Sequence, residues 1–227
     1  MIDRLRQTFG AAADPQRAAP MRAYMREQFP FLGIPSPARA ALSRPLLRGP
    51  FSEADLRETA RACWALPERE YQYFACDLLR RHAKALTPAS MPLLRELVTT
   101  KPWWDTVDVL AAHVAGPMVR AHPGLVSTMD EWTREGTDHW LVRTAILHQL
   151  RYRESLDFAR LSDYCRRWAA EPDFFIRKAI GWALREHAKT DPAAVRGFVA
   201  AHPDLSPLSV REALKNLGPA AGPPAPQ

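Results

Sequence analysis

Apolar side chains recur along most of the chain at the spacing of an α-helix. In segments 71–83, 140–150 and 174–188, apolar residues stand at positions i, i+3, i+4 and i+7, the pattern of a helix with one buried face. Strict alternation is rare, and no Asn-Gly or Asp-Gly pair marks a hairpin. Prolines often stand where helices would begin, and glycines stand at breaks. The pattern predicts an all-α protein of about eleven to thirteen helices, each of about 10–18 residues, joined by short loops.

One helical segment is repeated along the chain. Arg143, Ala145, Ile146 and Leu150 recur 34 residues further on, in segment 174–184, and a fainter third copy lies at 71–79. A period in the thirties with one long helix in each copy indicates stacked helix pairs, an α-solenoid. Such stacks curve, and their concave face is a natural groove for an extended partner. The alternative is a plain helical bundle in which the similarity arose by chance.

The composition favours a folded, basic protein. Hydrophobic residues make up 47% of the chain, the net charge is +6 and the sequence pI is about 9.5. This charge favours polyanions, either nucleic acid or an anionic membrane surface. No apolar run reaches the roughly 18–20 residues of a membrane span, and residues 1–6 carry no signal-peptide core, so we expect a cytoplasmic protein. We expect residues 1–217 to form a single domain and the Pro-, Ala- and Gly-rich residues 218–227 to form a disordered tail.

Metal and cofactor sites have little support in the sequence. The three cysteines, Cys63, Cys76 and Cys165, are odd in number, widely spaced and without a CxxC pair, which favours reduced, mostly buried thiols. The seven histidines form no HxxxH or HExxH motif, and there is no phosphate-binding glycine loop or nucleophile elbow. We therefore expect no metal site and no cofactor.

The segment Lys-Pro-Trp-Trp-Asp-Thr-Val-Asp at 101–108 is the first candidate for chemistry. Pro102 suits the first position of a helix, which would put both tryptophans in the first turn and place Trp104 and Asp108 on one face. Asp105 suits a first turn because its charge complements the helix dipole. Asp108 is followed by apolar residues, where a carboxylate is usually either paired or functional. A salt bridge from Asp108 to an arginine of the next repeat and a role in a site both remain open.

Two further clusters combine cations with aromatic residues. Arg143 lies on an apolar helix face, where it could be either a structural ion-pair partner or a clamp for a phosphate or carboxylate. A second helix carries a basic stripe in which one tryptophan interrupts a line of cations, a pattern typical of nucleic-acid binding. The alternative is that this tryptophan belongs to the core and the cations extend around it. The basic stripe consists of Lys178, Trp182, Arg185 and Lys189.

These residues together match a known family. The chain resembles the AlkD-like DNA glycosylases of the DNA alkylation repair family, which are built from HEAT-like helical repeats. The likeness covers nearly the whole chain and rests on segments 21–34, 101–108, 140–150 and 174–190, with a looser fit at 207–216. Together these motifs are far more specific than any one alone.

The resemblance implies a curved α-solenoid of HEAT-like repeats that holds duplex DNA on a basic concave face. It implies base excision repair by hydrolysis of the N-glycosidic bond of cationic purines alkylated at N3 or N7, with the base not extruded into a pocket. We expect a monomer that needs no cofactor. At the matching positions the family's carboxylate is Asp108, its flanking tryptophans are Trp104 and Trp182, its arginine is Arg143 and its N-terminal tyrosine is Tyr24. Lys178, Arg185 and Lys189 of the basic stripe are expected to contact DNA.

Two other functions compete with the glycosylase. A non-catalytic repeat protein that recognises distorted or branched DNA would bind tightly and with strong salt dependence, but would release no base. The intact set Trp104, Asp108, Arg143 and Trp182 argues against it, because a binding module has no need of a carboxylate facing phosphates. A helical scaffold for other proteins would have no affinity for DNA at physiological salt, and the basic stripe argues against that function.

Overall fold

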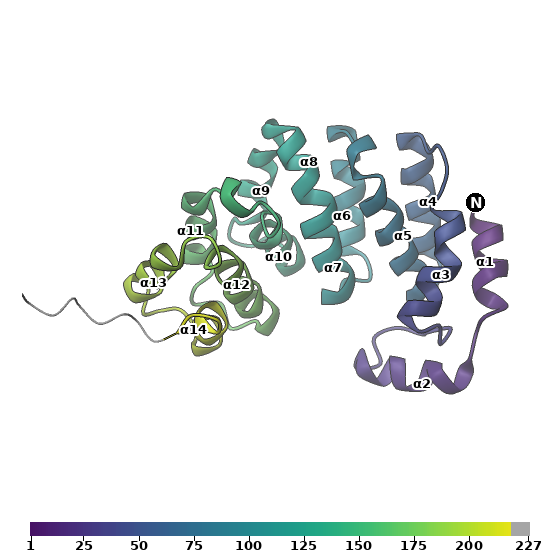
Figure 1. Ribbon diagram of the computed structural model, residues 1–227, viewed down its shortest axis with the longest axis horizontal. Coiled ribbons are helices and arrows are strands. Elements are labelled where there is room, and N and C mark those ends of the chain that lie inside the picture. The colour runs from purple at the N-terminus through teal and green to yellow at the C-terminus, as the bar shows by residue number, and fades with distance from the viewer. Residues whose placement is uncertain (219–227) are drawn as a thin grey trace, which may run out of the picture. The chain divides into compact units, whose positions relative to one another are not determined.

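The chain is helical throughout most of the range described by the computed structural model, residues 1–218, and no strand occurs in that range (Figure 1). The predicted all-α class is therefore confirmed. The chain divides into two compact units, Met1–Leu125 and a second unit that begins at Val126. The single domain, the curvature of the solenoid and its basic concave face stay predictions. The predicted tail falls, except for Gly218, on residues 219–227, outside the described range.

The first unit is built from eight α-helices and short turns among its described residues. Helix α2 lies crosswise to α1 and α3, whereas α4 packs against both α5 and α6 (Figure 1). Short 3₁₀ turns occupy 83–85, 88–90 and 123–125. The helices are α1 (Ile2–Gly10), α2 (Pro15–Tyr24), α3 (Ser36–Leu46), α4 (Glu53–Ala65), α5 (Arg69–Arg81), α6 (Met91–Thr99), α7 (Trp104–Leu110) and α8 (Gly116–Ala121).

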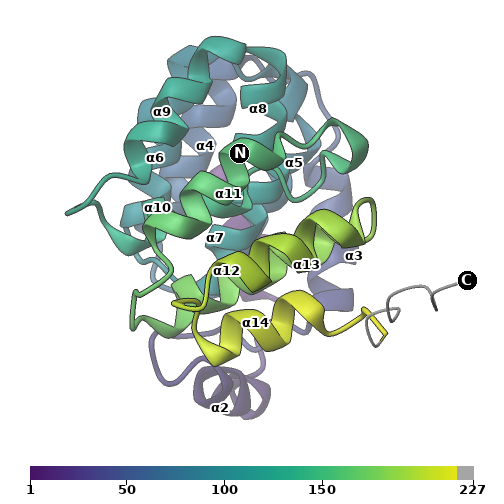
Figure 2. The same cartoon turned by 90° about the vertical axis from the view of Figure 1, so that its left-hand side faces the viewer.

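The second unit contains the two clearest copies of the repeat, in α10 and α12. Helices α12, α13 and α14 lie side by side, and α12 packs most extensively against α14 (Figure 2). A 3₁₀ turn at Arg153–Ser155 separates α10 from α11. The helices are α9 (Val126–Trp132), α10 (His139–Leu147), α11 (Phe158–Arg167), α12 (Phe174–His187), α13 (Pro192–Ala201) and α14 (Pro207–Leu214).

Helix starts are fixed by side chains that satisfy the first backbone N–H groups. Ser52 begins α4 with a capping box, in which its hydroxyl and a carboxylate three residues later each accept from the other's backbone. Proline occupies one of the first two positions of α2, α13 and α14, and the sequence predicts this for Pro192 of α13. Aspartates accept hydrogen bonds from the first turns of the four helices α10 to α13, and they are Asp138, Asp157, Asp173 and Asp191.

Helix α7 begins two residues later than the sequence predicts, at Trp104 instead of Pro102. Trp103 is the N-cap and has an extended backbone (φ −163°, ψ 158°), so the prediction that both tryptophans lie in the first turn is wrong for Trp103. The reason is that Lys101 adopts a left-handed conformation (φ 51°), so the backbone directly before Pro102 is not helical. From Trp104 the helix runs on through a π-helical turn at Ala111–Ala115 and into α8.

Hydrogen bonds link residues about one repeat apart in both units. Arg69 donates to the carbonyl of Lys101, Arg143 to that of Phe175, and the Ser209 hydroxyl to that of Arg177. Each of these pairs is separated by 32 positions in the chain. Side chains of one helix therefore satisfy backbone carbonyls near the start of a helix in the neighbouring copy, as expected of stacked helical repeats.

The three cysteines lie in the core, as the sequence predicts. Cys63, Cys76 and Cys165 are buried and free, and burial raises the pKa of the Cys63 thiol to about 12. Among residues 1–218, no cluster of three His, Cys, Asp or Glu side chains could hold a metal ion. Over the same range, no helix has the length and apolarity required to cross a bilayer.

Gly181 allows α12 and α14 to approach closely. A Cβ at this position would lie 2.5 Å from the Cβ of Glu212 and 3.0 Å from the Ser209 carbonyl oxygen. A methyl group there would force the helices apart, which typically costs about 1–3 kcal/mol in a packed core. The absence of a side chain at Gly181 therefore brings Glu212 against α12.

His148 is a buried histidine that must stay neutral in the folded protein. It is 1% exposed, and its Nδ1 donates a hydrogen bond to the Ala145 carbonyl at 2.6 Å. Burial disfavours the imidazolium and lowers the pKa from 6.5 to about 4, although the Ala145 carbonyl acts in the opposite direction. The unfolded chain therefore binds a proton at a pH where the folded chain does not.

We predict that the protein loses stability as the pH falls below 6.5. The contribution of His148 is fully present above its unfolded pKa and is lost progressively towards pH 4, by about 2 kcal/mol between pH 7.5 and pH 5. Urea unfolding at these two pH values would measure the loss, and His148→Gln should reduce it by about that amount. An identical pH dependence in the variant would exclude His148 as its source.

Candidate functional site

Lys101 anchors the segment that leads into α7. Its ammonium group donates to the carbonyls of Trp64 and Leu66 at 2.6 and 2.7 Å, at the C-terminal end of α4. A cation at this position satisfies helix carbonyls that have no partner within the helix and complements the negative end of the dipole. Burial lowers the pKa of Lys101, with a smaller effect from the nearby guanidinium of Arg69. Lys101 thus has a structural role in this motif.

Asp105 forms a buried ion pair with Arg69, whereas the two alternatives that the sequence leaves open for Asp108 stay predictions. Arg69 donates from Nε and Nη2 to the two carboxylate oxygens of Asp105 at 3.0 and 2.5 Å. The hydroxyl of Tyr73 donates to the same carboxylate at 2.6 Å. Burial, and then the negative charge of Asp105, raises the pKa of Tyr73. Asp105 does lie in the first turn of α7, where an acid suits the helix dipole, but it is also held by this pair.

Trp104, Asp108 and Tyr24 form the part of the predicted site that lies in the first unit. Trp104 and Asp108 are both half-buried and stand one turn apart on α7. Tyr24, the last residue of α2, is 72% exposed and meets Trp104 edge to face, with 6.3 Å between ring centroids. The π-helical turn begins three residues after Asp108, and such turns are frequent at functional sites.

The chain that follows Tyr24, directly after α2, has an unusual backbone. Arg26 and Glu27 both adopt left-handed conformations, with φ values of 55° and 59°. Non-glycine residues rarely do so, at a cost of about 1–2 kcal/mol each, and such strain often accompanies a functional site. Next to this turn, Met25, Phe29 and Phe31 form a buried cluster against which Tyr73, Trp103 and Trp104 pack. The cluster ties α2 to α7.

A cavity of about 310 Å³ lies beside Trp104 in the first unit. Its walls are mixed, because Met21 and Met25 face the charged groups of Arg39 and Asp77. The guanidinium of Arg39 lies 4.5 Å from the ring centroid of Tyr73 and 3.8 Å from the Asp77 carboxylate. The cavity is therefore lined by paired charges and does not present a basic surface.

Arg143 and Trp182 are neighbours in the second unit. Arg143 is 1% exposed, and its Nη1 donates to the carbonyl of Phe175. Its guanidinium carbon lies 5.5 Å from the centroid of the Trp182 ring and 6.0 Å from that of Phe175. In this structure the guanidinium is buried and bonded to the backbone. Its predicted role as a phosphate clamp stays a prediction.

Trp182 is half-buried among cations, as the basic stripe predicts. Lys178 Nζ lies 5.8 Å from its ring centroid and the guanidinium of Arg185 lies 6.0 Å away. Both cations are also paired with Glu212 of α14, at 2.9 and 2.5 Å. The hydrogen bond from Lys178 and then that from Arg185 lower the pKa of Glu212 against the opposing effect of burial.

The basic stripe is therefore less positive than its sequence suggests. Glu212 offsets one of the two positive charges of Lys178 and Arg185, and Lys189 pairs with Glu186 at 2.5 Å on the exposed surface. Sequence reasoning missed Glu212 because it stands 34 residues after Lys178, in a helix without an evident motif. The repeat period is the signal that could have found it, since Arg69 and Asp105 are separated by 36 residues.

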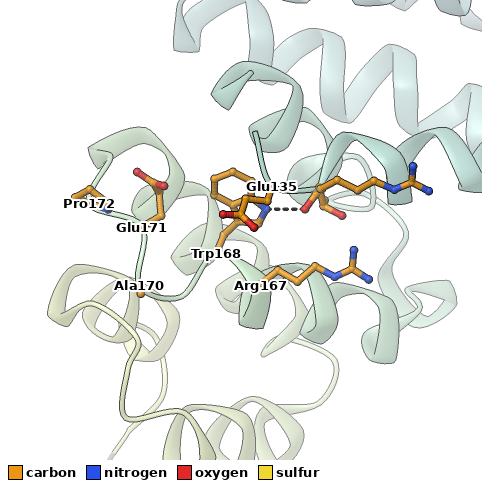
Figure 3. A pocket seen from close by; sticks show the side chains of 8 residues that line it. Glu135, Arg167, Trp168, Ala170, Glu171 and Pro172 are labelled. Atoms are coloured by element: carbon orange, nitrogen blue, oxygen red, sulfur yellow. Dashed lines mark hydrogen bonds between the residues drawn. The ribbon is translucent and has the colours of Figure 1, made fainter. Parts of the chain in front are cut away.

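A hollow of about 660 Å³ in the second unit contains none of the predicted site residues (Figure 3). The indole of Trp168 donates to the Thr133 carbonyl at 2.9 Å and forms part of its wall. Arg167 lines it together with Arg134, Glu135 and Glu171. Two carboxylates and two guanidiniums offset each other here, so this hollow is not a basic groove.

The predicted residues thus fall into two sets. Tyr24, Trp104 and Asp108 belong to the first unit, and they lie on α2 and α7. Arg143 on α10 and the basic stripe on α12 belong to the second unit. A single site formed from both sets stays a prediction.

Comparison with known proteins identifies the family. The family model described as DNA alkylation repair enzyme matches residues 5–217. A solved structure from Enterococcus faecalis, described as a predicted DNA alkylation repair enzyme, is 34% identical in sequence, with a TM-score of 0.84. The match covers 92% of this chain and 98% of that one. The search of curated proteins returned no match. From the family model and the solved structure, we conclude that the chain belongs to the DNA alkylation repair enzyme family.

Proposed function

We propose that the protein hydrolyses the N-glycosidic bond of cationic purines, alkylated at N3 or N7, in duplex DNA. The observation that carries the proposal is the placement of a half-buried carboxylate, Asp108, one helical turn after Trp104, whose edge meets the exposed ring of Tyr24. Membership of the DNA alkylation repair enzyme family supports a role in DNA repair. The reaction would be the first step of base excision repair.

The chemistry requires little more than a carboxylate near the sugar. Alkylation at N3 or N7 makes the purine cationic, so the base leaves without being protonated by a general acid. What the enzyme must stabilise is the positive charge that develops on the deoxyribose, and it must also place a water molecule. Asp108 is assigned both tasks, and the face of Trp104 adds a cation–π attraction of about 0.5–2 kcal/mol.

The two tryptophans have different electrostatic surroundings, which suggests different tasks. Trp104 shares its helix with Asp108, one turn further on, and this carboxylate favours a developing positive charge. Trp182 has three cationic groups within about 6 Å of its ring, and Glu212 pairs with two of them. Cationic groups around a ring are better suited to a phosphate than to an oxocarbenium ion. We therefore assign the deoxyribose to the Trp104 side and the DNA backbone to the Trp182 side.

Selectivity would come from the lability of the lesion. If the enzyme contacts the sugar and backbone and leaves the base stacked, neutral lesions such as uracil should be poor substrates, because they lack a good leaving group. The cavity beside Trp104 provides the contrasting mechanism, in which a base is extruded and bound. Release of uracil at a rate comparable to that of 7-methylguanine would favour extrusion.

The decisive experiment measures base release from duplex DNA containing N7-methylguanine. Wild type should release the base well above the spontaneous rate, and Asp108→Asn should reduce the single-turnover rate about 100-fold or more, because the amide keeps the shape but loses the charge. Asp3→Asn, an exposed acid in the first turn of α1, serves as the control and should retain the wild-type rate.

The outcomes separate the proposal from its competitor. Tight, salt-sensitive binding by wild type without any base release would exclude the glycosylase and support a non-catalytic protein that binds distorted DNA. Normal release by Asp108→Asn would leave the reaction in place but would remove Asp108 from its catalytic role.

A second prediction concerns Glu212 and the charge beside Trp182. In Glu212→Gln, Lys178 and Arg185 lose their shared carboxylate, so binding to undamaged duplex should tighten and the salt dependence should steepen by about one released counterion. The measurement is the affinity as a function of salt, with a thermal melt to check that α14 still packs. Glu58→Gln, an exposed residue of α4, is the control. An unchanged salt slope in a folded Glu212→Gln protein would place both cations outside the DNA interface.

A further inference from the structure

Two fully buried, oppositely charged neighbours begin helix α5. Arg69 and Glu70 are adjacent in sequence, and both are 0% exposed. Their side chains do not pair with each other in the contacts described below, but reach two different segments of the first unit. We propose that Arg69 and Glu70 are positioning residues that fix α2 and α7 relative to each other, and thereby fix Tyr24 against Trp104. This inference rests on the function proposed above.

Glu70 holds the segment that follows α2. Its Oε1 accepts hydrogen bonds from the backbone N–H groups of Gly33 and Ile34 at 2.9 and 3.1 Å, and its Oε2 accepts from Leu32 at 3.0 Å. Three successive backbone donors thus converge on one carboxylate. Without Glu70, these buried donors would lose their partner, which makes the conformation of the segment depend on this side chain.

The segment held by Glu70 is itself pressed against the start of α2. Gly33 has a φ of 87°, and a Cβ there would lie 2.0 Å from the carbonyl oxygen of Asp14 and 2.8 Å from the nitrogen of Ala18. The backbone N–H of Asp14 also donates to the Leu32 carbonyl at 2.8 Å. The carboxylate of Glu70 therefore determines where α2 begins, and Tyr24 is the last residue of that helix.

Arg69 holds the start of α7 from the other side. Besides its two bonds to Asp105, it donates from Nη1 to the Lys101 carbonyl at 2.9 Å and from Nη2 to the Thr106 hydroxyl at 2.9 Å. Each of the three guanidinium nitrogens has at least one acceptor, and all four bonds reach the segment 101–106. Trp104 lies between the residues that Arg69 binds.

Phe29 joins these two sets of contacts. The guanidinium carbon of Arg69 lies 3.8 Å from the ring centroid of Phe29, and Phe29 belongs to the cluster on which Trp104 packs. The backbone N–H of Arg69 also donates to the Pro30 carbonyl at 2.9 Å. The first turn of α5 is therefore bonded both to the chain that follows α2 and to the start of α7.

Hydrophobic residues could fill this space but could not direct the two segments in the same way. Buried charges are expensive to desolvate, and well-packed apolar side chains often serve stability as well or better. A fork of N–H donors and a carboxylate impose direction on their partners, and a site is most accurate when such groups hold it from rigid elements. Arg69 and Glu70 are consecutive residues in the first turn of α5. That single turn therefore sets the distance between segment 32–34, which Glu70 binds, and segment 101–106, which Arg69 binds.

The test compares Glu70→Gln and Arg69→Lys with a matched control. Gln keeps one oxygen acceptor but places an amide donor where Leu32 also donates, and Lys keeps the charge but loses the fork. The control is Glu53→Gln. Glu53 is likewise a carboxylate of the first unit that receives bonds across a repeat, from the Thr87 backbone at 3.0 Å and the Ser90 hydroxyl at 2.5 Å.

The readout is the single-turnover rate of 7-methylguanine release, with the reaction amplitude and the affinity for undamaged duplex measured in parallel. Both variants should lower the rate constant about tenfold or more at full amplitude, because a displacement of about 1 Å at a site can cost a hundredfold. DNA affinity should stay within about threefold of wild type. Glu53→Gln should retain the wild-type rate. Reduced amplitude at an unchanged rate constant would mean that only the folded fraction had fallen, and would overturn the inference.

The remaining outcomes are equally distinct. If wild type is active and the folded variants retain its rate constant, or if Glu53→Gln loses as much as they do, Arg69 and Glu70 have no special positioning role. If wild type itself releases no base, the proposed function fails, and the positioning role fails with it.

Discussion

A guanidinium buried in a helical protein must find acceptors for its N–H groups, and Arg69 finds them about one repeat further along the chain. This requirement fixes the start of α7, because the carboxylate of Asp105 and the carbonyl of Lys101 have to be presented to the fork. The turn at Lys101, the N-cap at Trp103 and the direction of α7 all accompany this one interaction.

A buried arginine that donates to a backbone carbonyl one repeat away also occurs in the second unit, with a different consequence. Arg143 is buried and donates to the backbone carbonyl of Phe175, also 32 positions away. Here the guanidinium lies beside Trp182, and the charge around the indole is moderated by Glu212. In one unit the buried arginine orients a neighbouring acidic helix, whereas in the other it contributes to a cationic neighbourhood. In this chain, the same kind of contact between repeats thus supports an acidic helix in one unit and a group of cations in the other.

Much of the fold could be predicted because local patterns agree with the final structure. The helical period, the prolines near helix starts and the 34-residue repeat all correspond to observed helices and contacts. The helices α7 and α12 carry Trp104, Asp108 and Trp182 where the sequence places them. What could not be predicted depends on pairing between distant residues. Arg69 and Asp105 stand 36 positions apart, and no local pattern in the sequence pairs them. Likewise, the charges of Lys178 and Arg185 are evident, but the acid that offsets them belongs to α14.

Gly181 links the packing of α14 to the electrostatics of the neighbouring indole. Any side chain at this position collides with the stem of Glu212, so the two positions cannot vary independently in related proteins. A relative with alanine or serine here would have to shift α14 outward or shorten the residue opposite. Either change would separate the acid from its two cations and expose more positive potential. Backbone crowding at one glycine therefore helps to set the positive potential around Trp182.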